Sequence, residues 1–268
     1  MAGARFERVR LNRADLRRPF PSGFARRLRG QAVKALTRRG KYLLAHLSSG
    51  DTLVVHLGMS GSFRVEPTSA ARARRDPDTA LAYRHDHVVF DMSSGQTVTF
   101  NDPRRFGVMD LERADRQEGQ QQRSSPLAQL GPEPLSKAFT AASLAERLAG
   151  RRIPLKVALL DQRVVAGVGN IYASEALHLA RLSPLRLAST IATRSGAPRP
   201  AAVRLAAAIK SVLTRAIRLK STDDYSSSGR FRVYDREGER CPTPGCGGTI
   251  RRLWQAGRST FYCSDCQR

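Results

Sequence analysis

The sequence ends in CPTPGCGGTIRRLWQAGRSTFYCSDCQR, residues 241–268, and this stretch holds all four cysteines of the chain. They form two pairs, Cys241 with Cys246 and Cys263 with Cys266, each spanning a short turn sequence. Thiolates paired in this way can converge on one tetrahedral ion, and Zn²⁺ accepts four sulfur ligands. Two disulfides are the alternative, but the first residues do not resemble an export signal. The spacing therefore predicts one structural zinc ion, with no ligand position left for a catalytic water.

The residues between the two cysteine pairs are predicted to form a β-hairpin. TIRRLW, residues 249–254, and RSTFYC, residues 258–263, flank a turn at Gln-Ala-Gly. Arg258 follows that turn directly. A zinc ribbon of this kind occurs in many nucleic-acid-binding proteins and also as a simple staple, so the module alone leaves the function open.

The charge of the chain indicates a polyanionic partner. Lysine and arginine number 46 against 23 acidic residues, a formal net charge of +23. Nucleic acid is favoured over an anionic membrane surface, and no apolar run approaches the ~20 residues needed to span a bilayer. We therefore expect a cytoplasmic protein that binds nucleic acid and has no membrane partner.

The N-terminal part is predicted to be a β-sandwich over residues 1–115. Apolar and polar positions alternate in residues 31–66 and 85–111, and a Ser-Ser-Gly turn divides each of these stretches. The intervening residues 66–84 are predicted to be a mobile surface insertion. Residues 116–134 are polar, rich in glutamine and interrupted by proline and glycine, which is typical of a linker.

Beyond the linker the pattern becomes helical and then returns to strands. Asn170 is expected to cap the helix that follows the Gly-rich loop VVAGVG. In the last helix an apolar stripe is expected to run from Leu205 to Ile217. Helices are predicted at 140–150, 155–162, 170–182 and 199–220, within a domain of residues 135–230. A zinc finger follows at 231–268, with a further strand predicted at 231–238, so the fold class is α+β and multidomain.

Four further motifs combine glycine with basic, apolar or aromatic side chains or with a helix N-terminus. RRGKYLL contains Lys41, HLGMSG contains Met59 in a Gly-rich turn, and NDPRRFG contains Arg104 and Phe106. GVGNIYASEAL joins a Gly-rich loop to a helix N-terminus, which can bind a phosphate. The chain lacks the third glycine and the preceding strand of a dinucleotide-binding fingerprint, so a Rossmann site is not expected.

Taken in this order, and together with LGPEPL and GRSTFYCSDCQR, these motifs resemble the formamidopyrimidine-DNA glycosylase family of bacterial repair enzymes. The resemblance covers nearly the whole chain, from about residue 9 to 268. It implies an N-terminal β-sandwich, a helix–two-turn–helix domain and a zinc finger. It also implies removal of oxidised purines from double-stranded DNA, cleavage at the resulting abasic site, and a monomer.

The resemblance assigns roles to particular residues. It implies that Met59, Arg104 and Phe106 fill the gap left by a flipped base, although core packing is the alternative for Met59. It implies phosphate binding by His85, Arg104, Arg151 and Asn170. It implies catalytic roles for Lys41, Glu175 and Arg258, although a solvent-facing position on the helix is the alternative for Glu175. His85 and His87 also suggest a metal pair, but nothing nearby completes such a site.

The chain departs from the family pattern in two places. The family begins with a proline nucleophile followed by glutamate on a first helix, whereas this chain begins Met1-Ala2-Gly3. A start placed too late, or a truncated form of the protein, is favoured over a genuine lesion-binding protein that does not cut. The segment 221–231 is short and polar, which keeps an endonuclease VIII-like preference for oxidised pyrimidines open. A zinc-ribbon protein of the ribosome or RNA is the third hypothesis.

Overall fold

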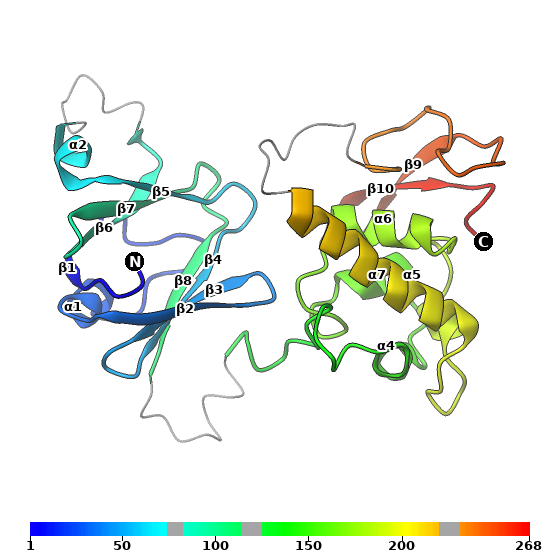
Figure 1. The fold of residues 1–268 in the computed structure, drawn as a ribbon, viewed down its shortest axis with the longest axis horizontal. Coiled ribbons are helices and arrows are strands. Elements are labelled where there is room, and N and C mark those ends of the chain that lie inside the picture. Colours follow the sequence, from blue (N-terminus) through cyan, green and yellow to red (C-terminus); the bar gives the residue numbers. More distant parts are fainter. Residues whose placement is uncertain (74–82, 114–124, 220–230) are drawn as a thin grey trace. The chain divides into compact units, whose positions relative to one another are not determined.

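The computed structural model describes residues 1–73, 83–113, 125–219 and 231–268. The chain forms two compact units, Met1–Ala128 and Gln129–Arg268 (Figure 1). The division between them lies within the predicted linker 116–134, and the finer domain boundaries remain predictions. Each unit is described by itself below.

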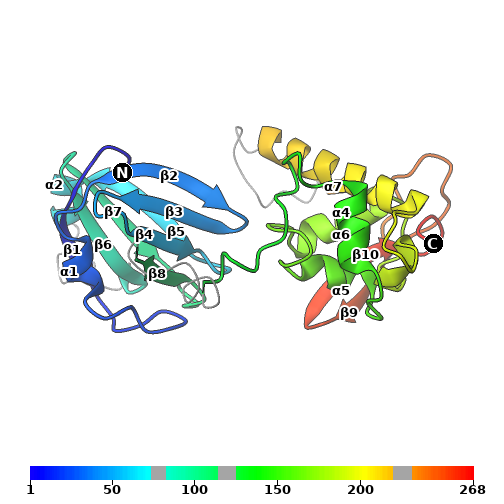
Figure 2. The same cartoon turned by 90° about the horizontal axis from the view of Figure 1, so that it is seen from below.

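The N-terminal unit contains two antiparallel four-stranded sheets (Figures 1 and 2). Burial against the facing sheet explains the alternating pattern of the sequence. β6 is buried along its whole length, and its carboxylates Asp86 and Asp91 form salt bridges with Arg64 and Arg10. Phe6, Phe90 and Phe100 are fully buried in the core between the sheets. One sheet has the order β1 (Phe6–Leu11), β6 (Asp86–Met92), β7 (Gln96–Asn101), β5 (Ser62–Pro67), and the other β2 (Val33–Arg39), β3 (Tyr42–Leu47), β4 (Thr52–His56), β8 (Val108–Glu112). The predicted β-sandwich is confirmed.

Both Ser-Ser-Gly sequences are hairpin turns, as predicted. One joins β3 to β4 and the other joins β6 to β7, and Gly50 and Gly95 have the positive φ values that such turns require. Among its described residues, this unit also has the short helices α1 (Phe24–Leu28) and α2 (Thr68–Ala73). Within the predicted insertion 66–84, Glu66 and Pro67 end β5, residues 68–73 are helical, and residues 74–82 lie outside the described part of the chain.

The C-terminal unit is built on the predicted helices, all four of which are confirmed with slightly shorter bounds. Leu144, Leu159, Leu177 and Leu205, one from each helix, are fully buried together in its core. Thr140 begins the first helix with a capping box, in which Thr140 and Ser143 satisfy each other's backbone N–H groups. The helices are α4 (Ala141–Leu148), α5 (Leu155–Leu160), α6 (Asn170–Leu179) and α7 (Pro200–Leu219), with a 3₁₀ turn η2 (Ala188–Ile191).

The apolar stripe predicted for α7 packs on the core at Leu205, Ile209, Val212 and Leu213, and its last residue, Ile217, is exposed.

Two local predictions were wrong. Asn170 is the first residue of α6 and Gly169 is its cap, because the Asn170 amide bonds to another part of the chain. Residues 231–238 form turns rather than a strand, since Asp235 and Gly238 adopt positive φ values that a strand cannot contain.

The C-terminal hairpin consists of β9 (Ile250–Gln255) and β10 (Arg258–Cys263). Ala256 and Gly257 both have positive φ, as a two-residue hairpin turn requires, so the predicted turn is confirmed. The hairpin packs against α6. Among the described residues, no helix is long and apolar enough to cross a membrane.

Candidate DNA-binding surfaces and metal centre

Strand register brings three of the motif turns to one end of the β2-β3-β4-β8 sheet. Tyr42 is paired with His56, and His56 is paired with Val108. The turn containing Lys41 precedes Tyr42, the Met59 turn follows His56, and the Arg104 turn precedes Val108. Residues that are far apart in the sequence therefore meet at one edge of the sandwich.

A buried carboxylate joins two of these turns. Asp102 is fully buried, its Oδ1 accepts from Ser60 Oγ at 2.6 Å, and its Oδ2 accepts from the Gly107 N–H at 2.7 Å. Ser60 Oγ in turn accepts from the Arg104 N–H at 3.2 Å. Ser60 and Asp102 therefore fix the turns that carry Met59 and Arg104, a role that neither residue was assigned from the sequence.

Met59, Arg104 and Phe106 are the residues expected to fill the gap left by a flipped base, and we call them the wedge. They lie on these fixed turns. Met59 is 70% exposed, which excludes core packing as the reason for its presence, and Phe106 is 39% exposed. The Arg104 guanidinium lies over the Phe106 ring, 4.6 Å from its centre, as in a cation–π contact. A Cβ atom on Gly58 would lie 2.5 Å from the Phe106 carbonyl carbon, so only glycine allows the turns to approach so closely.

Cationic groups gather near the Met59 turn. Lys41 is exposed at the turn between β2 and β3. His56, which was not singled out from the sequence, accepts from the Gly58 N–H through Nδ1, which leaves the proton on Nε2. Burial lowers the pKa of His56, and the charges of Lys41 and Arg17 lower it further. The signal in the sequence that could have identified His56 was its position immediately before the LGMSG turn.

His85 and His87, the two histidines of the HDH sequence, do not form a metal pair. His87 is buried and donates from Nε2 to the Asp102 carbonyl at 2.8 Å. His85 is half-buried, its Nε2 accepts from Arg84 Nε at 3.0 Å, and its carbonyl accepts from the Asp102 N–H. His85 therefore lies beside the Asp102 turn, and its role in phosphate binding remains a prediction.

In the C-terminal unit, a buried lysine and a half-buried asparagine fix the peptide next to Arg258. Lys156 Nζ donates to the Ser259 carbonyl at 3.0 Å and to Thr260 Oγ1 at 2.6 Å, and Asn170 Nδ2 donates to the same carbonyl at 3.0 Å. Burial, with the nearby charge of Arg258, lowers the pKa of Lys156 to about 8. Arg258 itself is exposed at the hairpin turn. Lys156 was not singled out from the sequence. The available signal was that it is the single lysine within the otherwise apolar LKVALL.

Arg151 is already engaged in this structure. Its Nη1 forms a salt bridge with Asp161 at 2.9 Å, and its Nε donates to the Arg147 carbonyl. Burial raises the pKa of Asp161, but hydrogen bonds from Arg163 and Arg151 outweigh this effect and lower the pKa to about 2. The Arg151 guanidinium is therefore held beside Asp161, the residue that caps the C-terminal end of α5, and phosphate binding by Arg151 remains a prediction.

Glu175 faces the protein interior rather than solvent. It is 5% exposed, Oε2 accepts from the Arg232 N–H at 2.8 Å, and Oε1 accepts from the N–H groups of Val233 and Tyr234. The solvent-facing alternative is therefore wrong. These bonds also explain why residues 232–234 turn instead of pairing as a strand.

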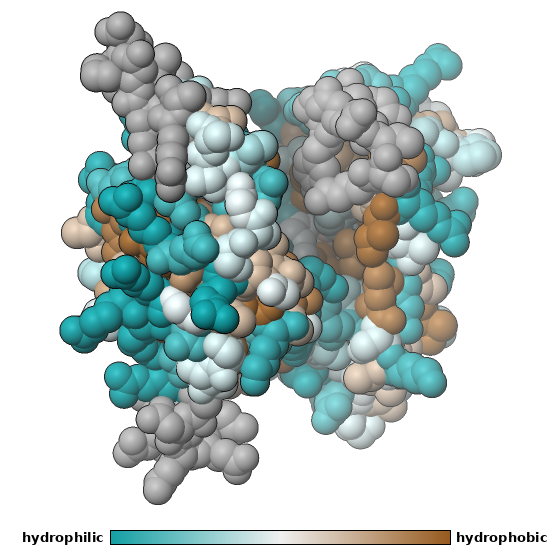
Figure 3. Space-filling model, turned by 60° about the vertical axis from the view of Figure 1, so that its left-hand side comes forward, coloured by the Kyte–Doolittle hydropathy of each residue, from teal (hydrophilic) through white to brown (hydrophobic). Residues whose placement is uncertain are grey.

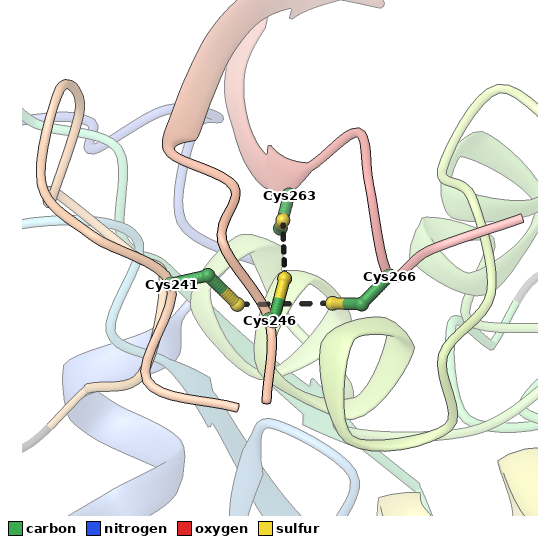
Figure 4. Close-up of side chains that lie close together, drawn as sticks. All are labelled: Cys241, Cys246, Cys263 and Cys266. Atoms are coloured by element: carbon green, nitrogen blue, oxygen red, sulfur yellow. Dashed lines mark hydrogen bonds between the residues drawn. The ribbon is translucent and has the colours of Figure 1, made fainter. Parts of the chain in front are cut away.

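The four cysteines converge as the spacing predicted (Figure 4). Their Sγ atoms all lie within 4.8 Å of one another, and Cys241–Cys266 and Cys246–Cys263 are each separated by 3.7 Å. Four sulfurs around Zn²⁺ at ~2.3 Å are about 3.8 Å apart, so the cluster has the size that a tetrahedral ion requires. A disulfide needs ~2.05 Å, and all four cysteines are free. This cluster can hold a metal ion.

Models of two protein domains match the chain. The N-terminal domain of formamidopyrimidine-DNA glycosylase matches residues 1–109, and the H2TH domain of formamidopyrimidine-DNA glycosylase matches residues 130–227. Together the two matches cover most of both units described above.

Relatives and solved structures agree with these matches. The chain is 54% identical to a formamidopyrimidine-DNA glycosylase of Rhodopseudomonas palustris and 51% identical to that of Azorhizobium caulinodans, covering all of this chain and 94% of each relative. The crystal structure of MutM (Fpg) from Thermus thermophilus has a TM-score of 0.78 at 35% identity, covering 100% of this chain and 92% of that one. A structure of MutM in complex with DNA containing carbocyclic 8-oxo-G has a TM-score of 0.81 at 28% identity, covering 100% and 94%. This chain belongs to the formamidopyrimidine-DNA glycosylase family.

Proposed function

We propose that this protein is a base-excision repair enzyme, a DNA glycosylase and abasic-site lyase for oxidised purines in double-stranded DNA. The relatives that support this proposal are formamidopyrimidine-DNA glycosylases. Solved structures of similar fold contain DNA with 8-oxo-G, with a formamidopyrimidine lesion or with an abasic site. We place the protein in the bacterial cytoplasm, where the chromosome lies, and expect it to act as a monomer.

The observation that carries the proposal is the exposed group of Met59, Arg104 and Phe106 on turns fixed by Asp102. Extruding a base from a duplex costs a few kcal/mol and leaves a gap in the stack. An apolar side chain and an aromatic ring that are already exposed and rigidly held can fill that gap without further loss of backbone entropy. The Arg104 guanidinium, stacked on Phe106, supplies donors for the unpaired base on the opposite strand.

Phosphate contacts are assigned to cations on both units. Lys41 serves the N-terminal unit, and Arg258, next to the Ser259 carbonyl that Lys156 and Asn170 hold, serves the C-terminal unit. Such contacts position the duplex without reading its sequence. Hydrophilic side chains cover much of the face of the N-terminal unit seen in Figure 3.

We assign the cysteine cluster to one structural zinc ion. Cys241, Cys246, Cys263 and Cys266 would hold it, and four thiolates leave no coordination position for catalysis. When bound, the ion supplies no step of the reaction and instead fixes the ends of β9 and β10. The residues of this chain then keep Arg258 at the tip of a rigid hairpin.

Family membership implies a Schiff base between an N-terminal secondary amine and the sugar C1′. An α-amino group titrates near pH 8, so much of it is an unprotonated nucleophile at neutral pH. The resemblance implies a catalytic role for Glu175, whose carboxylate holds the amides of residues 232–234. Selectivity among oxidised bases was expected to depend on residues 221–231, of which only Phe231 belongs to the described residues.

The test uses duplex DNA with a single 8-oxoguanine opposite cytosine. Strand cleavage and borohydride trapping are measured for the chain as printed and for the same chain preceded by the Pro-Glu first helix of a relative. We expect a trapped complex and cleavage with the extended form. Lesion binding without cleavage in both forms would favour a non-catalytic binding protein, and a preference for oxidised pyrimidines would favour an endonuclease VIII-like enzyme. Absence of lesion binding in both forms would refute the DNA-repair proposal altogether.

A further inference from the structure

Helix α6 carries a buried histidine against the cysteine cluster. His178 is 1% exposed, and its Nε2 lies 3.4 Å from Cys241 Sγ and 3.2 Å from Thr243 Oγ1. On the other side of the ring, Arg232 Nε lies 3.4 Å from His178 Nδ1. Both ring nitrogens therefore face defined partners, and one of these partners, Cys241, belongs to the cysteine cluster.

The partners determine where the imidazole proton is. An arginine N–H can only donate, so Nδ1 must accept from Arg232 and therefore carries no proton. The ring is then the tautomer with its proton on Nε2, which points toward Cys241 Sγ and Thr243 Oγ1. The geometry makes His178 a donor to the cluster rather than a competing ligand.

A second route reaches another sulfur. Thr243 Oγ1 lies 3.8 Å from Cys266 Sγ, and a hydroxyl can accept one hydrogen bond while donating another. The single Nε2 proton of His178 is then shared between Cys241 Sγ and Thr243 Oγ1, and Thr243 can donate its own proton to Cys266. A chain of polar contacts connects Arg232, His178 and Thr243, and we call it the α6 relay. It places an N–H donor and an O–H donor beside two of the four sulfurs.

Donors of this kind matter because four thiolates around one divalent ion leave a net charge of −2. Hydrogen bonds from the surroundings offset that charge and orient the ligands, and losing such an outer partner typically weakens metal binding by 10–100-fold. We propose that the α6 relay is the outer support of the metal site, with His178 Nε2–H donating to the Cys241 thiolate. Metal retention thereby depends on a helix outside the cysteine segment.

The same helix links this support to the candidate site. Asn170 and Glu175 also lie on α6, where Asn170 holds the Ser259 carbonyl and Glu175 holds the amides of residues 232–234. Arg232 therefore contributes its backbone to Glu175 and its side chain to His178. A single helix thus positions the hairpin, the 232–234 turn and the cluster.

The test measures zinc affinity of the full-length, zinc-loaded protein by competition with a chromophoric chelator. His178→Phe fills the buried volume but has no N–H group, and we expect roughly 10–100-fold weaker zinc binding. His178→Gln keeps a donor of similar reach and should restore affinity to within a few-fold of wild type. His46→Phe, a histidine of β3 in the N-terminal unit, is the matched control and should leave zinc binding unchanged.

Thr243→Val removes only the hydroxyl and keeps the shape of the side chain, so it tests the relay even if His178→Phe does not fold. We expect several-fold faster zinc release from this variant. In the cobalt-substituted protein, the sulfur-to-cobalt charge-transfer bands should shift in both variants while their intensity still indicates four sulfur ligands. Wild-type zinc affinity and unshifted cobalt bands in Thr243→Val, and in His178→Phe where it folds, would overturn the proposal.

Discussion

Met59 is an apolar side chain that the fold leaves mostly in water. Its turn is fixed by the Ser60–Asp102 hydrogen bond and by the close approach of Gly58 to Phe106, so its exposure is imposed by the structure. A flexible, polarisable side chain held in this way gains little from the folded protein itself. Burying the Met59 side chain against a bound partner can therefore contribute favourable free energy to binding.

Met59→Ala should therefore separate function from stability. We expect the free energy of unfolding to change by less than about 0.5 kcal/mol, because an exposed side chain loses few contacts. Affinity for a duplex with an abasic-site analogue should fall at least several-fold, as measured by fluorescence anisotropy. Val65→Ala, at another exposed apolar position of the same unit, is the control and should change neither quantity. Unchanged affinity in Met59→Ala would remove Met59 from the wedge.

At the scale of elements, the β9–β10 hairpin depends on groups outside itself. A two-stranded hairpin is marginal in water, and this one is held by the cysteine cluster at one end and by Lys156 and Asn170 near the other. The hairpin can therefore present Arg258 rigidly only when both attachments are intact.

The Lys156 attachment should be visible in the pH dependence of stability. Its pKa is about 8 in the folded protein and 10.5 as the ordinary value, so between these pH values the unfolded chain binds more protons. The free energy of unfolding should therefore rise with pH across this window, by on the order of 3 kcal/mol. Lys156→Met should remove this rise in chemical denaturation experiments, whereas Lys137→Met, on the surface, should retain it. An identical rise in both variants would show that another group causes it.

Removal of the metal should release the other end of the hairpin. We expect a chelator to abolish hydrogen-exchange protection of the β9 and β10 amides, because small metal modules fold only with their ion. Amides of β6 and β7 in the N-terminal unit should stay protected. Protection of β9 and β10 that survives complete zinc removal would show that packing on α6 suffices.

At the scale of the whole molecule, the dominant property is the net charge of +23. Such an excess attracts polyanions over several ångströms and raises association rates, but it does not select a sequence. Selection of a lesion must then come from the few side chains that enter the duplex. The charge and the wedge therefore contribute to different steps of recognition.

Binding should weaken steeply with salt. If Lys41, Arg104, Arg151 and Arg258 each neutralise one phosphate, the logarithm of the binding constant should fall with the logarithm of salt concentration with a slope of about −4. Arg258→Gln should make that slope shallower by roughly 1, whereas Met59→Ala should leave it unchanged. An unaltered slope in Arg258→Gln would exclude a phosphate contact by this residue.

Local patterns were sufficient for most elements of the fold. Ser-Ser-Gly turns between alternating strands, the helix beginning at Thr140 and the two cysteine pairs depend on neighbouring residues, and all three are confirmed. The strand expected at 231–238 failed because Glu175, more than fifty positions away, binds its amides. Lys156, His56 and His178 were missed because each looks like an ordinary helix or strand residue.

The sequence by itself determined the class of the fold, the cysteine cluster and the positive charge, since these follow from composition, periodicity and spacing over a few residues. Only the tertiary structure decided which side chains meet. It left Met59 exposed, turned Glu175 inward, and brought Lys156 and Asn170 to the carbonyl of Ser259. The physical reason is that buried polar groups must find hydrogen-bond partners, and those partners are set by packing between distant segments rather than by local sequence.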